Sequence, residues 1–496
     1  MLQRILIANR GEIAVRIIRA CRELGIGSVA VYSDADVMAP HTRLADRAVR
    51  IGPAPAAESY LSMDAVIDAA RQTGCDAIHP GYGFLSENDA FVTRCAEAGL
   101  IFIGPPPDAM AHMGSKVAAR EMAQRAGVPV VPGATPSDQG DDAIAAAAMR
   151  VGFPLLLKPS EGGGGIGMKE VRQESELAGA IQQARREAIA AFGDGRLYVE
   201  RLVDRPRHVE VQICADSQGQ VVHLFERECS IQRRHQKVIE ETPSPALTPV
   251  LRTRMGDAAV TIARAAGYRN AGTVEFLLEG SGDTARFYFL EMNTRLQVEH
   301  PITEQVVGVD LVHAQIGVAS GLPLPWTQAS LTQRGHAIEA RIYAEDAAHH
   351  DLPQAGPLLL YREPRMPGIR VDAGVAEGGD VTVHYDPMIA KVIATAESRE
   401  HARRRLLAAL RQFPILGVRT NIAFLINILE HPRFEAGQID TGFLDREADD
   451  VRPRPAGDAP PDLAALAAAI RTEMPPVAGV AAAGHDPWIS LRGARV

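Results

Sequence analysis

The stretch "RILIANRGEIAVRIIRACRELGIGSVAVYS" (residues 4–33) decides the fold class of this chain. Residues 4–8 and 28–33 are short apolar runs rich in β-branched side chains, which indicate buried strands. Over residues 12–24 apolar side chains recur every three or four positions, which predicts a helix. Because two strands joined through a helix pair in parallel, the sequence predicts a parallel sheet with crossover helices. The loop after the first strand lacks G-x-G-x-x-G, which argues against a dinucleotide site.

Length and composition indicate a globular protein of about three domains. A chain of 496 residues is too long for one core at the usual ~150 residues per domain. Charged residues make up 23% and the net charge is -9, so no basic excess points to nucleic acid. The five cysteines form no CxxC pair, so we expect neither a disulfide framework nor a structural zinc. No signal peptide or run of ~20 apolar residues is present, so we expect a cytoplasmic protein without a membrane partner.

A run of glycines follows a predicted strand in the second region. "FPLLLKPS" (153–160) is strand-like, "EGGGGIGM" (161–168) follows, and "KEV" (169–171) resumes a strand. Successive glycines expose backbone N–H groups that can close over phosphate oxygens, so we interpret the run as a phosphate lid. Composition alone also allows a flexible linker, and the GxxxxGK[ST] pattern of a Walker A loop is absent.

The following segments predict a mixed or antiparallel lobe inserted in the α/β chain. Strands are expected over 197–203, 208–216 and 221–230, the last two forming a hairpin, and a helix begins near Lys116 and ends at Gly127. Beyond 346 come short strands with Pro/Gly turns and a helix over 421–431. From about 447 the chain is a Pro/Ala-rich tail with one short Ala-rich helix near 461–473.

The stretch "YFLEMNTRLQVEHP" (288–301) carries the strongest chemical signal. Five polar residues occupy every second position, and in an extended chain they would all face one way: Glu291, Asn293, Arg295, Gln297 and Glu299. Periodicity alone is equally typical of an amphipathic strand with a solvated face. The mixture of acids, amides and a guanidinium favours an ordered site. Glu275 lies in the apolar strand "GTVEFLLE" (272–279), where a carboxylate needs a partner or an ion.

Carboxylates on neighbouring strands favour Mg²⁺, which prefers hard oxygen ligands and is commonly bound together with nucleotide phosphates. Lys116 opens a helix and Lys158 ends the strand before the glycines, so both are placed to meet phosphates. Each lysine alone is more often a surface residue. Together with the glycine run they indicate a nucleotide site.

Long motifs in this sequence resemble the biotin carboxylase branch of the ATP-grasp enzymes, over about residues 1–446. They are "IANRGEIAVRIIRA", "HPGYGFLSEN", "MGSK", "KPSEGGGGIGM", "RHVEVQ", "CSIQRRHQKVIEE", "GTVEFL", "EMNTRLQVEHPITE", "HAIEARI" and "YDPMIAKV". The resemblance implies an α/β ATP-grasp fold with an inserted lid subdomain. The implied domains are an N-terminal Rossmann-like (preATP-grasp) domain (1–113), an ATP-grasp domain (114–335) with a mobile lid (about 131–203), a C-terminal α+β biotin carboxylase domain (336–446) and a tail or linker (447–496).

The resemblance also implies roles for individual residues. The metal ligands would be Glu275, Glu291 and Asn293. The phosphate clamp would be Lys116, Lys158, Lys237, Gly163, Gly164 and Gly165. The adenosine pocket would be Glu200, Leu202, His208, Gln232, His235 and Leu277. The bicarbonate site would be Arg295, Gln297 and the Val298 N–H, and the biotin site would be Tyr82 and Arg341. Glu299 would be the catalytic base, acting with Arg295, Arg341 and Lys237. Taken without the resemblance, Tyr82, His235, Lys237 and Arg341 are more often structural or solvated residues.

The implied activity is carboxylation of biotin with ATP, bicarbonate and Mg²⁺ or Mn²⁺ through carboxyphosphate, the first half-reaction of an acetyl-CoA or acyl-CoA carboxylase. The chain holds no Met-Lys-Met carrier motif, since its one Met-Lys pair, Met168-Lys169, lies in the lid. Biotin is therefore expected on a separate biotin carboxyl carrier protein, with carboxyltransferase subunits as further partners. A homodimer is expected because four residues match the dimer contact of relatives: Arg16, Arg19, Glu23 and Arg370.

The glycine lid departs from the family pattern at two positions. Ile166 stands where relatives usually carry Arg or Lys, and Glu161 replaces a small residue. The lid thus loses a cation and gains an anion, so we expect weaker ATP binding without loss of activity. Two alternatives remain open: another ATP-grasp carboxylase or ligase with a different nucleophile, and a catalytically silent nucleotide-binding scaffold of a carboxylase complex.

Overall fold

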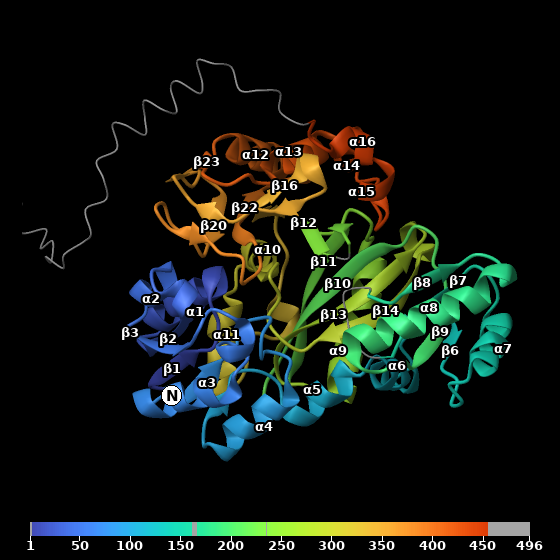
Figure 1. Ribbon diagram of the computed structural model, residues 1–496, viewed down its shortest axis with the longest axis horizontal. Coiled ribbons are helices and arrows are strands. Elements are labelled where there is room, and N and C mark those ends of the chain that lie inside the picture. The colour runs from blue at the N-terminus through green and yellow to red at the C-terminus, as the bar shows by residue number, and fades with distance from the viewer. Residues whose placement is uncertain (1, 161–165, 235, 455–496) are drawn as a thin grey trace, which may run out of the picture. The chain divides into compact units, whose positions relative to one another are not determined.

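The computed structural model describes residues 2–160, 166–234 and 236–454, and Met1–Pro453 belong to one compact unit. Within this unit the chain forms a parallel sheet, a small antiparallel sheet and a large antiparallel sheet, with helices packed on them (Figure 1). The predicted α/β class is confirmed. None of the helices in the described ranges combines the length and the apolar character that a membrane-spanning segment needs. The helix predicted near 461–473 lies outside the described residues.

The N-terminal region contains the parallel sheet that the opening stretch predicts. Its five strands have the order β3-β2-β1-β4-β5, and every pair in it is parallel. The strands are β1 (Arg4–Ile7), β2 (Gly27–Ser33), β3 (Arg47–Gly52), β4 (Ala77–His79) and β5 (Ile101–Phe102). The helices are α1 (Gly11–Glu23), α2 (Pro40–Leu44), α3 (Met63–Thr73) and α4 (Asp89–Glu97). The buried face of α1 begins at Glu12 and includes Ile13, Ile17 and Cys21, so helical periodicity was the correct guide here.

Two helices and a small lobe follow. Ser115 caps α6 (Lys116–Arg125), because its side chain accepts a hydrogen bond from the N–H of Ala118; α5 (Pro107–Gly114) precedes it. The small lobe, residues 131–203, is an antiparallel sheet of order β6-β9-β7-β8. Its elements are β6 (Gly133–Ala134), α7 (Asp141–Val151), β7 (Leu155–Pro159), β8 (Lys169–Val171), α8 (Glu174–Phe192) and β9 (Leu197–Arg201). Because β7 and β8 are paired neighbours, the predicted strand–loop–strand arrangement around the glycine run is confirmed.

The large sheet runs through the rest of the molecule with the order β14-β13-β10-β11-β12-β15-β22-β20, and all its pairs are antiparallel. Its strands are β10 (Arg207–Ala215), β11 (Val221–Arg233), β12 (Gln236–Thr242), β13 (Asn270–Glu279), β14 (Arg286–Asn293), β15 (His336–Tyr343), β20 (Ile369–Ala373) and β22 (Met388–Ala396). The antiparallel lobe that the sequence predicts thus continues into the third region, whose β15, β20 and β22 extend the same sheet.

Helices cover this sheet and complete its core. They are α9 (Pro249–Ala265), α10 (His300–Val307), α11 (Leu311–Ala319), α12 (Arg399–Arg411), α13 (Ile422–Glu430), α14 (Pro432–Glu435), α15 (Phe443–Arg446) and α16 (Ala448–Val451). On β15, Ile338, Ala340 and Ile342 pack into the core with α12 and α13, so Glu339 and Arg341 point to the opposite face. Val451 is buried in the same core, so the described packing continues past residue 446.

Short strands complete the C-terminal region, as the Pro/Gly-rich sequence predicts. They are β16 (Glu345–Asp346), β17 (Leu352–Pro353), β18 (Gly356–Pro357), β19 (Leu360–Tyr361), β21 (Asp380–Val381) and β23 (Ile415–Leu416). They pair two by two beside the large sheet. The division of the compact unit into the three predicted domains stays a prediction.

Gly335 sets the start of β15, which carries Arg341, and it allows a test of the fold. We expect Gly335→Ala to lower the free energy of unfolding more than Gly321→Ala does. Both glycines have positive φ, which costs an L-residue ~1–2 kcal/mol. A Cβ at Gly335 would also lie 2.5 Å from the carbonyl oxygen of Ala396, whereas one at Gly321 meets nothing within 4 Å.

Overpacking of this kind costs a further ~1–3 kcal/mol. Urea unfolding of both variants measures the difference, and equal losses would contradict the steric role of Gly335.

Candidate functional site

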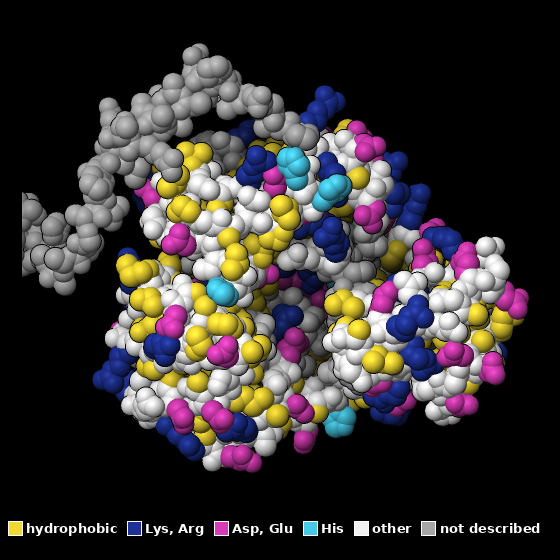
Figure 2. All heavy atoms as spheres, in the orientation of Figure 1, with side chains coloured by type: hydrophobic (Ala, Val, Ile, Leu, Met, Phe, Trp, Pro, Cys, Tyr) yellow, Lys and Arg dark blue, Asp and Glu magenta, His cyan; other side chains and the backbone are white. Residues whose placement is uncertain are grey.

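Charged side chains of the large sheet gather on one face, where β10, β11 and β13 lie side by side. The register places Glu210 opposite both Glu275 and Arg227. Directly opposed residues point to the same face of a sheet, so these side chains meet. Figure 2 shows charged side chains inside a hollow in the middle of this view, where Figure 1 places these strands.

Lys237 on β12 is the centre of this cluster. Its Nζ donates to Oε1 of Glu275 at 2.9 Å and to Oε1 of Glu299 at 2.6 Å, and it also donates to Glu210. Burial lowers the pKa of Lys237, but the three carboxylates outweigh burial and hold this pKa well above its usual range. Burial likewise raises the pKa of Glu275 and Glu299, but their cationic partners hold both well below the usual range. Lys237 is therefore charged and is shared by at least two ionised carboxylates.

Arg341 on β15 binds the second oxygen of Glu299. Its Nη2 donates to Oε2 of Glu299 at 3.0 Å, and its Nε donates to Oε1 of Glu240 at 2.6 Å. Burial raises the pKa of Glu240 to about 7 although Arg341 opposes the shift. Glu299 thus lies between two cations that come from different strands, and each of its oxygens accepts a hydrogen bond.

The predicted metal ligands lie together where β13 and β14 pair. The register places Glu275 opposite Glu291, and Nδ2 of Asn293 donates to Oε1 of Glu275 at 2.8 Å. Burial and the neighbouring Glu275 raise the pKa of Glu291, a repulsion that a divalent cation would relieve. Two carboxylates and an amide oxygen are ligands that Mg²⁺ takes, so the residues present fit the predicted ion.

The strand that carries these ligands ends at Asn293, so the extended conformation predicted for residues 288–301 is wrong beyond that point. A loop over residues 294–299 leads into α10 instead. Even so, Nε2 of Gln297 lies within hydrogen-bonding distance of Oε1 of Glu275, at 3.3 Å. The alternating polar residues reach one site through packing of a loop, not through the periodicity of a strand.

Glu87 fixes the beginning of this loop, although it was not predicted from the sequence. Its Oε2 accepts from Nε of Arg295 at 3.0 Å, and its Oε1 accepts from the N–H of Thr294 at 3.2 Å. Arg295 also donates through Nη2 to Oδ1 of Asn293 at 3.2 Å. Glu87 lies inside a quoted motif, but a single acid in a loop carries no periodic signal that would identify it.

The two predicted phosphate-binding lysines lie beside the carboxylate cluster. Lys158 lies one residue before the end of β7, and its buried Nζ donates to Oε2 of Glu200 at 2.9 Å. Lys116 opens α6, and its Nζ lies 4.0 Å from Oε2 of Glu291. Both lysines act electrostatically on Glu291, whose pKa they lower against the larger effect of burial. The structure therefore brings Lys116, Lys158 and Lys237 to one group of acids.

The residues predicted to bind adenosine come from several strands. Nε2 of His208 on β10 lies 2.9 Å from Oε2 of Glu275, and Gln232 on β11 pairs with Lys237. Leu202 follows β9, and its N–H donates to the carbonyl of Pro154. Leu277 belongs to a small apolar cluster that also contains Val131, Val203 and Tyr288. A planar apolar ring could pack on this cluster next to the acids.

Part of the predicted site lies outside the described residues: Glu161, Gly163, Gly164, Gly165 and His235. Ile166 is described, and 53% of its surface is exposed. The exposed side chain at this position of the lid is therefore apolar.

The loop that carries Tyr82 is held by buried hydrogen bonds. Nδ2 of Asn9 donates to the carbonyl oxygens of Pro80 and Tyr82, both at 2.7 Å, and the Tyr82 hydroxyl donates to Glu12. Asn9 and Glu12 were not singled out from the sequence. A lone acid on the buried face of α1 was the signal that could have identified Glu12.

His79 fixes the beginning of the same loop. Its Nδ1 accepts from the N–H of Gly81 at 3.1 Å, and its Nε2 lies 3.2 Å from Oε1 of Gln315. These partners match a neutral imidazole protonated at Nε2. Burial lowers the pKa of His79 to about 3.

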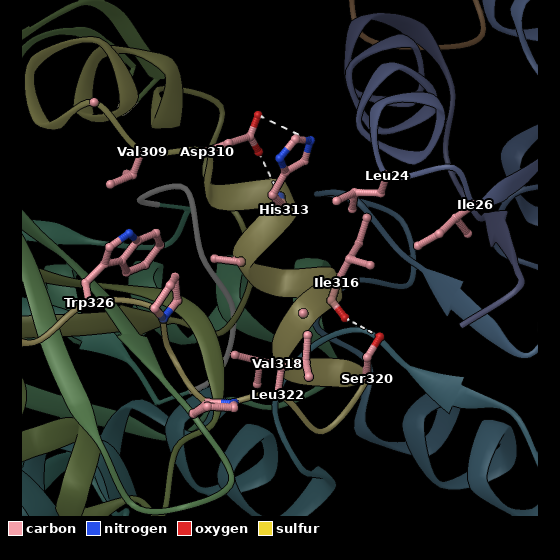
Figure 3. Close-up of a pocket in the computed structure, with 15 residues that line it drawn as sticks. Leu24, Ile26, Val309, Asp310, His313, Ile316, Val318, Ser320, Leu322 and Trp326 are labelled. Atoms are coloured by element: carbon pink, nitrogen blue, oxygen red, sulfur yellow. Dashed lines mark hydrogen bonds and ion pairs between the residues drawn. The ribbon is translucent and has the colours of Figure 1, made fainter. Parts of the chain in front are cut away.

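An apolar pocket of about 380 Å³ lies elsewhere, between the end of α1 and α11. Figure 3 shows its lining, with Leu24, Ile26 and Trp326 among the labelled side chains. No predicted catalytic or ligand-binding residue occurs among the described residues that line it. The pocket is therefore separate from the charged cluster.

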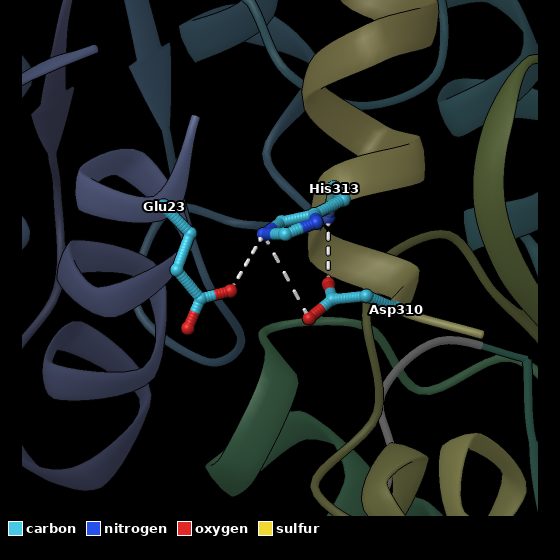
Figure 4. Close-up of side chains that lie close together, drawn as sticks. All are labelled: Glu23, Asp310 and His313. Carbon is cyan, nitrogen blue, oxygen red and sulfur yellow. Dashed lines mark hydrogen bonds and ion pairs between the residues drawn. The ribbon is translucent and has the colours of Figure 1, made fainter. Parts of the chain in front are cut away.

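Two residues that line this pocket, Asp310 and His313, lie close to Glu23 (Figure 4). Nε2 of His313 lies 3.2 Å from Oε2 of Glu23 and 3.9 Å from Oδ2 of Asp310. The same Oδ2 of Asp310 accepts from Nη2 of Arg16 at 2.6 Å. Because Arg16 already binds this oxygen, the group forms an ion-pair network and not a metal site.

Three family models match consecutive parts of the chain. Residues 1–110 match "Biotin carboxylase, N-terminal domain", residues 115–327 match "Carbamoyl-phosphate synthase L chain, ATP binding domain", and residues 339–446 match "Biotin carboxylase C-terminal domain". The predicted ATP-grasp fold is therefore confirmed.

Similar proteins agree with these matches. A biotin carboxylase of Halalkalibacterium halodurans is 50% identical over 444 residues, which cover 90% of this chain and 97% of that protein. The alpha subunit of a mitochondrial methylcrotonoyl-CoA carboxylase of Oryza sativa is 51% identical over 451 residues, covering 90% of this chain. This chain spans only 61% of the length of that subunit.

Solved structures show the same fold. A biotin carboxylase of Campylobacter jejuni, in complex with a β-γ-ATP ligand, has a TM-score of 0.87 and 44% sequence identity. The match covers 90% of this chain and 99% of the Campylobacter jejuni chain. The biotin carboxylase domain dimer of Hydrogenobacter thermophilus 2-oxoglutarate carboxylase was solved with MgADP, ADP and bicarbonate. Its TM-score is 0.87 and its sequence identity is 42%, and the match covers 92% of this chain and 100% of that chain.

The neutral state of His79 predicts a pH dependence of stability. In the unfolded chain a histidine has a pKa of ~6.5, so below that pH the unfolded state binds a proton that folded His79 does not. Stability from this residue is complete above pH ~6.5 and is lost as the pH falls toward about 3.

Between pH 7.5 and 5.5 the wild type should lose about 1.4 kcal/mol more stability than His79→Gln does, because the other buried histidines, such as His41, titrate in both proteins. Urea unfolding at both pH values measures it. If the difference in free energy of unfolding between the two proteins were the same at both pH values, His79 would not be neutral in the folded state.

Proposed function

The chain belongs to the biotin carboxylase family, and we propose that it carboxylates biotin on a separate carrier protein, with ATP and bicarbonate as substrates and carboxyphosphate as intermediate. This is the first half-reaction of an acetyl-CoA or acyl-CoA carboxylase. The observation that carries the proposal is the position of Glu299, buried between Lys237 and Arg341. The arrangement supports one carboxylate acting next to two cations, which the reaction of two anionic substrates requires.

ATP is assigned to the lysines beside the carboxylate cluster. Lys116, Lys158 and Lys237 supply positive charge for the phosphates, together with the N–H groups of Gly163, Gly164 and Gly165. The adenosine pocket is assigned to Glu200, Leu202, His208, Gln232, His235 and Leu277. Phosphoryl transfer depends mainly on positioning and charge neutralisation, which this group of cations supports.

A divalent cation is assigned to Glu275, Glu291 and Asn293, with Mg²⁺ or Mn²⁺ as the ion. When bound, it would neutralise phosphate charge. Lys237 lies next to these ligands and contacts Glu275 directly. Phosphate oxygens that attract Lys237 would weaken its ion pairs with Glu275 and Glu299.

Glu299 is assigned as the general base for bicarbonate. It is ionised, because Lys237 and Arg341 outweigh the effect of burial on its pKa. As phosphate attracts Lys237, the pKa of Glu299 rises, and the carboxylate becomes a better acceptor for the bicarbonate proton. Such proton transfer contributes ~10²–10⁴ in rate. Arg295, Gln297 and the Val298 N–H are assigned to hold the bicarbonate anion, which attacks the γ-phosphorus and displaces ADP to give carboxyphosphate.

Biotin is assigned to Tyr82 and Arg341. Carboxyphosphate breaks down to CO₂ and phosphate next to biotin, and the phosphate takes the N1′ proton. The guanidinium of Arg341 stabilises negative charge on the ureido oxygen as N1′ is carboxylated. Arg341 is held by Glu240 and Glu299, and Tyr82 by Glu12, so both groups are positioned before the substrate arrives.

The proposed partners are a biotin carboxyl carrier protein, carboxyltransferase subunits and a second copy of this chain. The dimer is assigned to Arg16, Arg19, Glu23 and Arg370. The Hydrogenobacter thermophilus relative is a biotin carboxylase domain dimer, which supports this assignment.

Free biotin provides the decisive test of the function. We expect bicarbonate-dependent ADP release from the purified protein with Mg-ATP, and stimulation of that release by biotin. Arg341→Met should reduce carboxybiotin formation by at least ~100-fold, because an electrostatic donor to a developing oxyanion is lost. Slow bicarbonate-dependent ADP release should persist in this variant.

Absence of biotin stimulation in the wild type would favour another ATP-grasp ligase or a silent scaffold. Equal loss of ADP release and carboxybiotin formation in Arg341→Met would refute the assigned role of Arg341.

The glycine lid provides a second test. Ile166→Arg should lower the KM for ATP about tenfold, because a charged hydrogen bond of ~1.5–3 kcal/mol would be added. Val250→Arg adds the same charge at another exposed apolar position, at the start of α9, and should leave this KM unchanged. Steady-state ADP release measures both. An unchanged KM in Ile166→Arg would show that the missing cation is irrelevant.

A further inference from the structure

Lys391 is a buried cation that the proposed reaction does not use. It lies in β22 with an exposed surface of 0%, inside the otherwise apolar run "MIAKVIATA". A buried ammonium group is costly unless anionic or carbonyl partners replace its water. The partners of Lys391 therefore indicate what this charge is for.

Two loops that are distant in sequence meet at Lys391. Its Nζ donates to the carbonyl oxygen of Val298 and lies 3.1 Å from Oε1 of Glu12. The same oxygen of Glu12 accepts the hydrogen bond from the Tyr82 hydroxyl. One lysine thus connects the loop of residues 294–299 with the loop of Tyr82.

Glu12 is the main anionic partner of Lys391. Asp372 lies opposite Lys391 on β20, but both of its oxygens bind Arg370, at 2.9 and 2.7 Å. Glu339 on β15 is fully buried, and within the described residues neither of its carboxylate oxygens has a hydrogen-bond partner. Burial raises the pKa of Glu339 well above its usual range, so Glu339 is neutral.

The contact with Val298 acts on Glu299. The carbonyl of Val298 belongs to the peptide bond that leads into Glu299, so Lys391 fixes the backbone from which this carboxylate extends. Glu299 must keep one oxygen on Lys237, at 2.6 Å, and the other on Arg341, at 3.0 Å. A rotation of this peptide would move the carboxylate away from at least one cation.

We propose that Lys391 is a positioning residue that, through Glu12, locks the bicarbonate loop (residues 294–299) to the biotin loop that carries Tyr82. It touches neither substrate and acts through Val298 and Glu12. The inference rests on the proposed function, because it assigns bicarbonate to the first loop and biotin to the second.

Three variants of the full chain and a control test this inference. Lys391→Met removes the donor, and Lys391→Arg keeps a buried cation and donor. Because Lys391→Met leaves Glu12 as an uncompensated buried charge, the double variant Glu12→Gln/Lys391→Met removes that charge as well. The control is Arg399→Met, which breaks the ion pair of Arg399 with Glu241, at 2.6 and 2.9 Å.

We expect Lys391→Met and the double variant to raise the KM for bicarbonate about tenfold or more, with the KM for ATP changed less than about twofold. The carboxybiotin formed per ADP released should fall in both. Lys391→Arg should have a KM for bicarbonate close to that of the wild type. Arg399→Met should lower the melting temperature without changing the KM for bicarbonate.

The double variant decides the question even if Lys391→Met does not fold. If it melts like the wild type and has a normal bicarbonate KM, Lys391 is only a structural residue and the inference is wrong. Absence of bicarbonate-dependent ADP release from the wild type would refute the proposed function and this inference together.

Discussion

One buried ammonium group, that of Lys237, makes the charged centre of this protein possible. Glu210, Glu275 and Glu299 share this cation, and each would lose an ion pair in its absence, which is costly for a buried carboxylate. The ion pairs depend on strand register. A slip of one residue in β12 would turn Lys237 to the opposite face of the sheet and leave the acids without their shared cation.

The large sheet has to be continuous for the same reason. Lys237 comes from β12, but the second cation on Glu299 comes from β15 and the cation behind the loop comes from β22. Lys237 and Arg341 are about a hundred residues apart in the chain, and Arg341 and Lys391 are about fifty apart. Their antiparallel pairing places Arg341 opposite Lys391, so one arginine faces the acids while the neighbouring lysine holds the loop. The site is therefore a property of the whole sheet and not of any single motif.

Local signals predicted the elements well and their junctions less well. The strand–helix–strand opening, the strands beside the glycine run and the hairpin of β10 and β11 all follow from local sequence patterns. In these patterns apolar side chains recur about every 3.6 residues in helices and form short runs or alternate in strands. The extended conformation beyond Asn293 was wrong, because alternation of polar residues in a loop looks like alternation in a strand. Glu87 had no periodic signal at all, and Lys391 and Glu12 were visible only as single charges in apolar surroundings.

The sequence by itself determined the α/β class and the family resemblance and predicted the site residues, because helical and strand periodicities and long motifs are local properties of the chain. Only the tertiary structure decided which groups pair: Lys237 with three acids, Arg341 with Glu299, and Lys391 with Val298 and Glu12. Such pairs join strands and loops that are distant in sequence. They follow from register and from the need to neutralise every buried charge, and neither of these can be read from one segment alone.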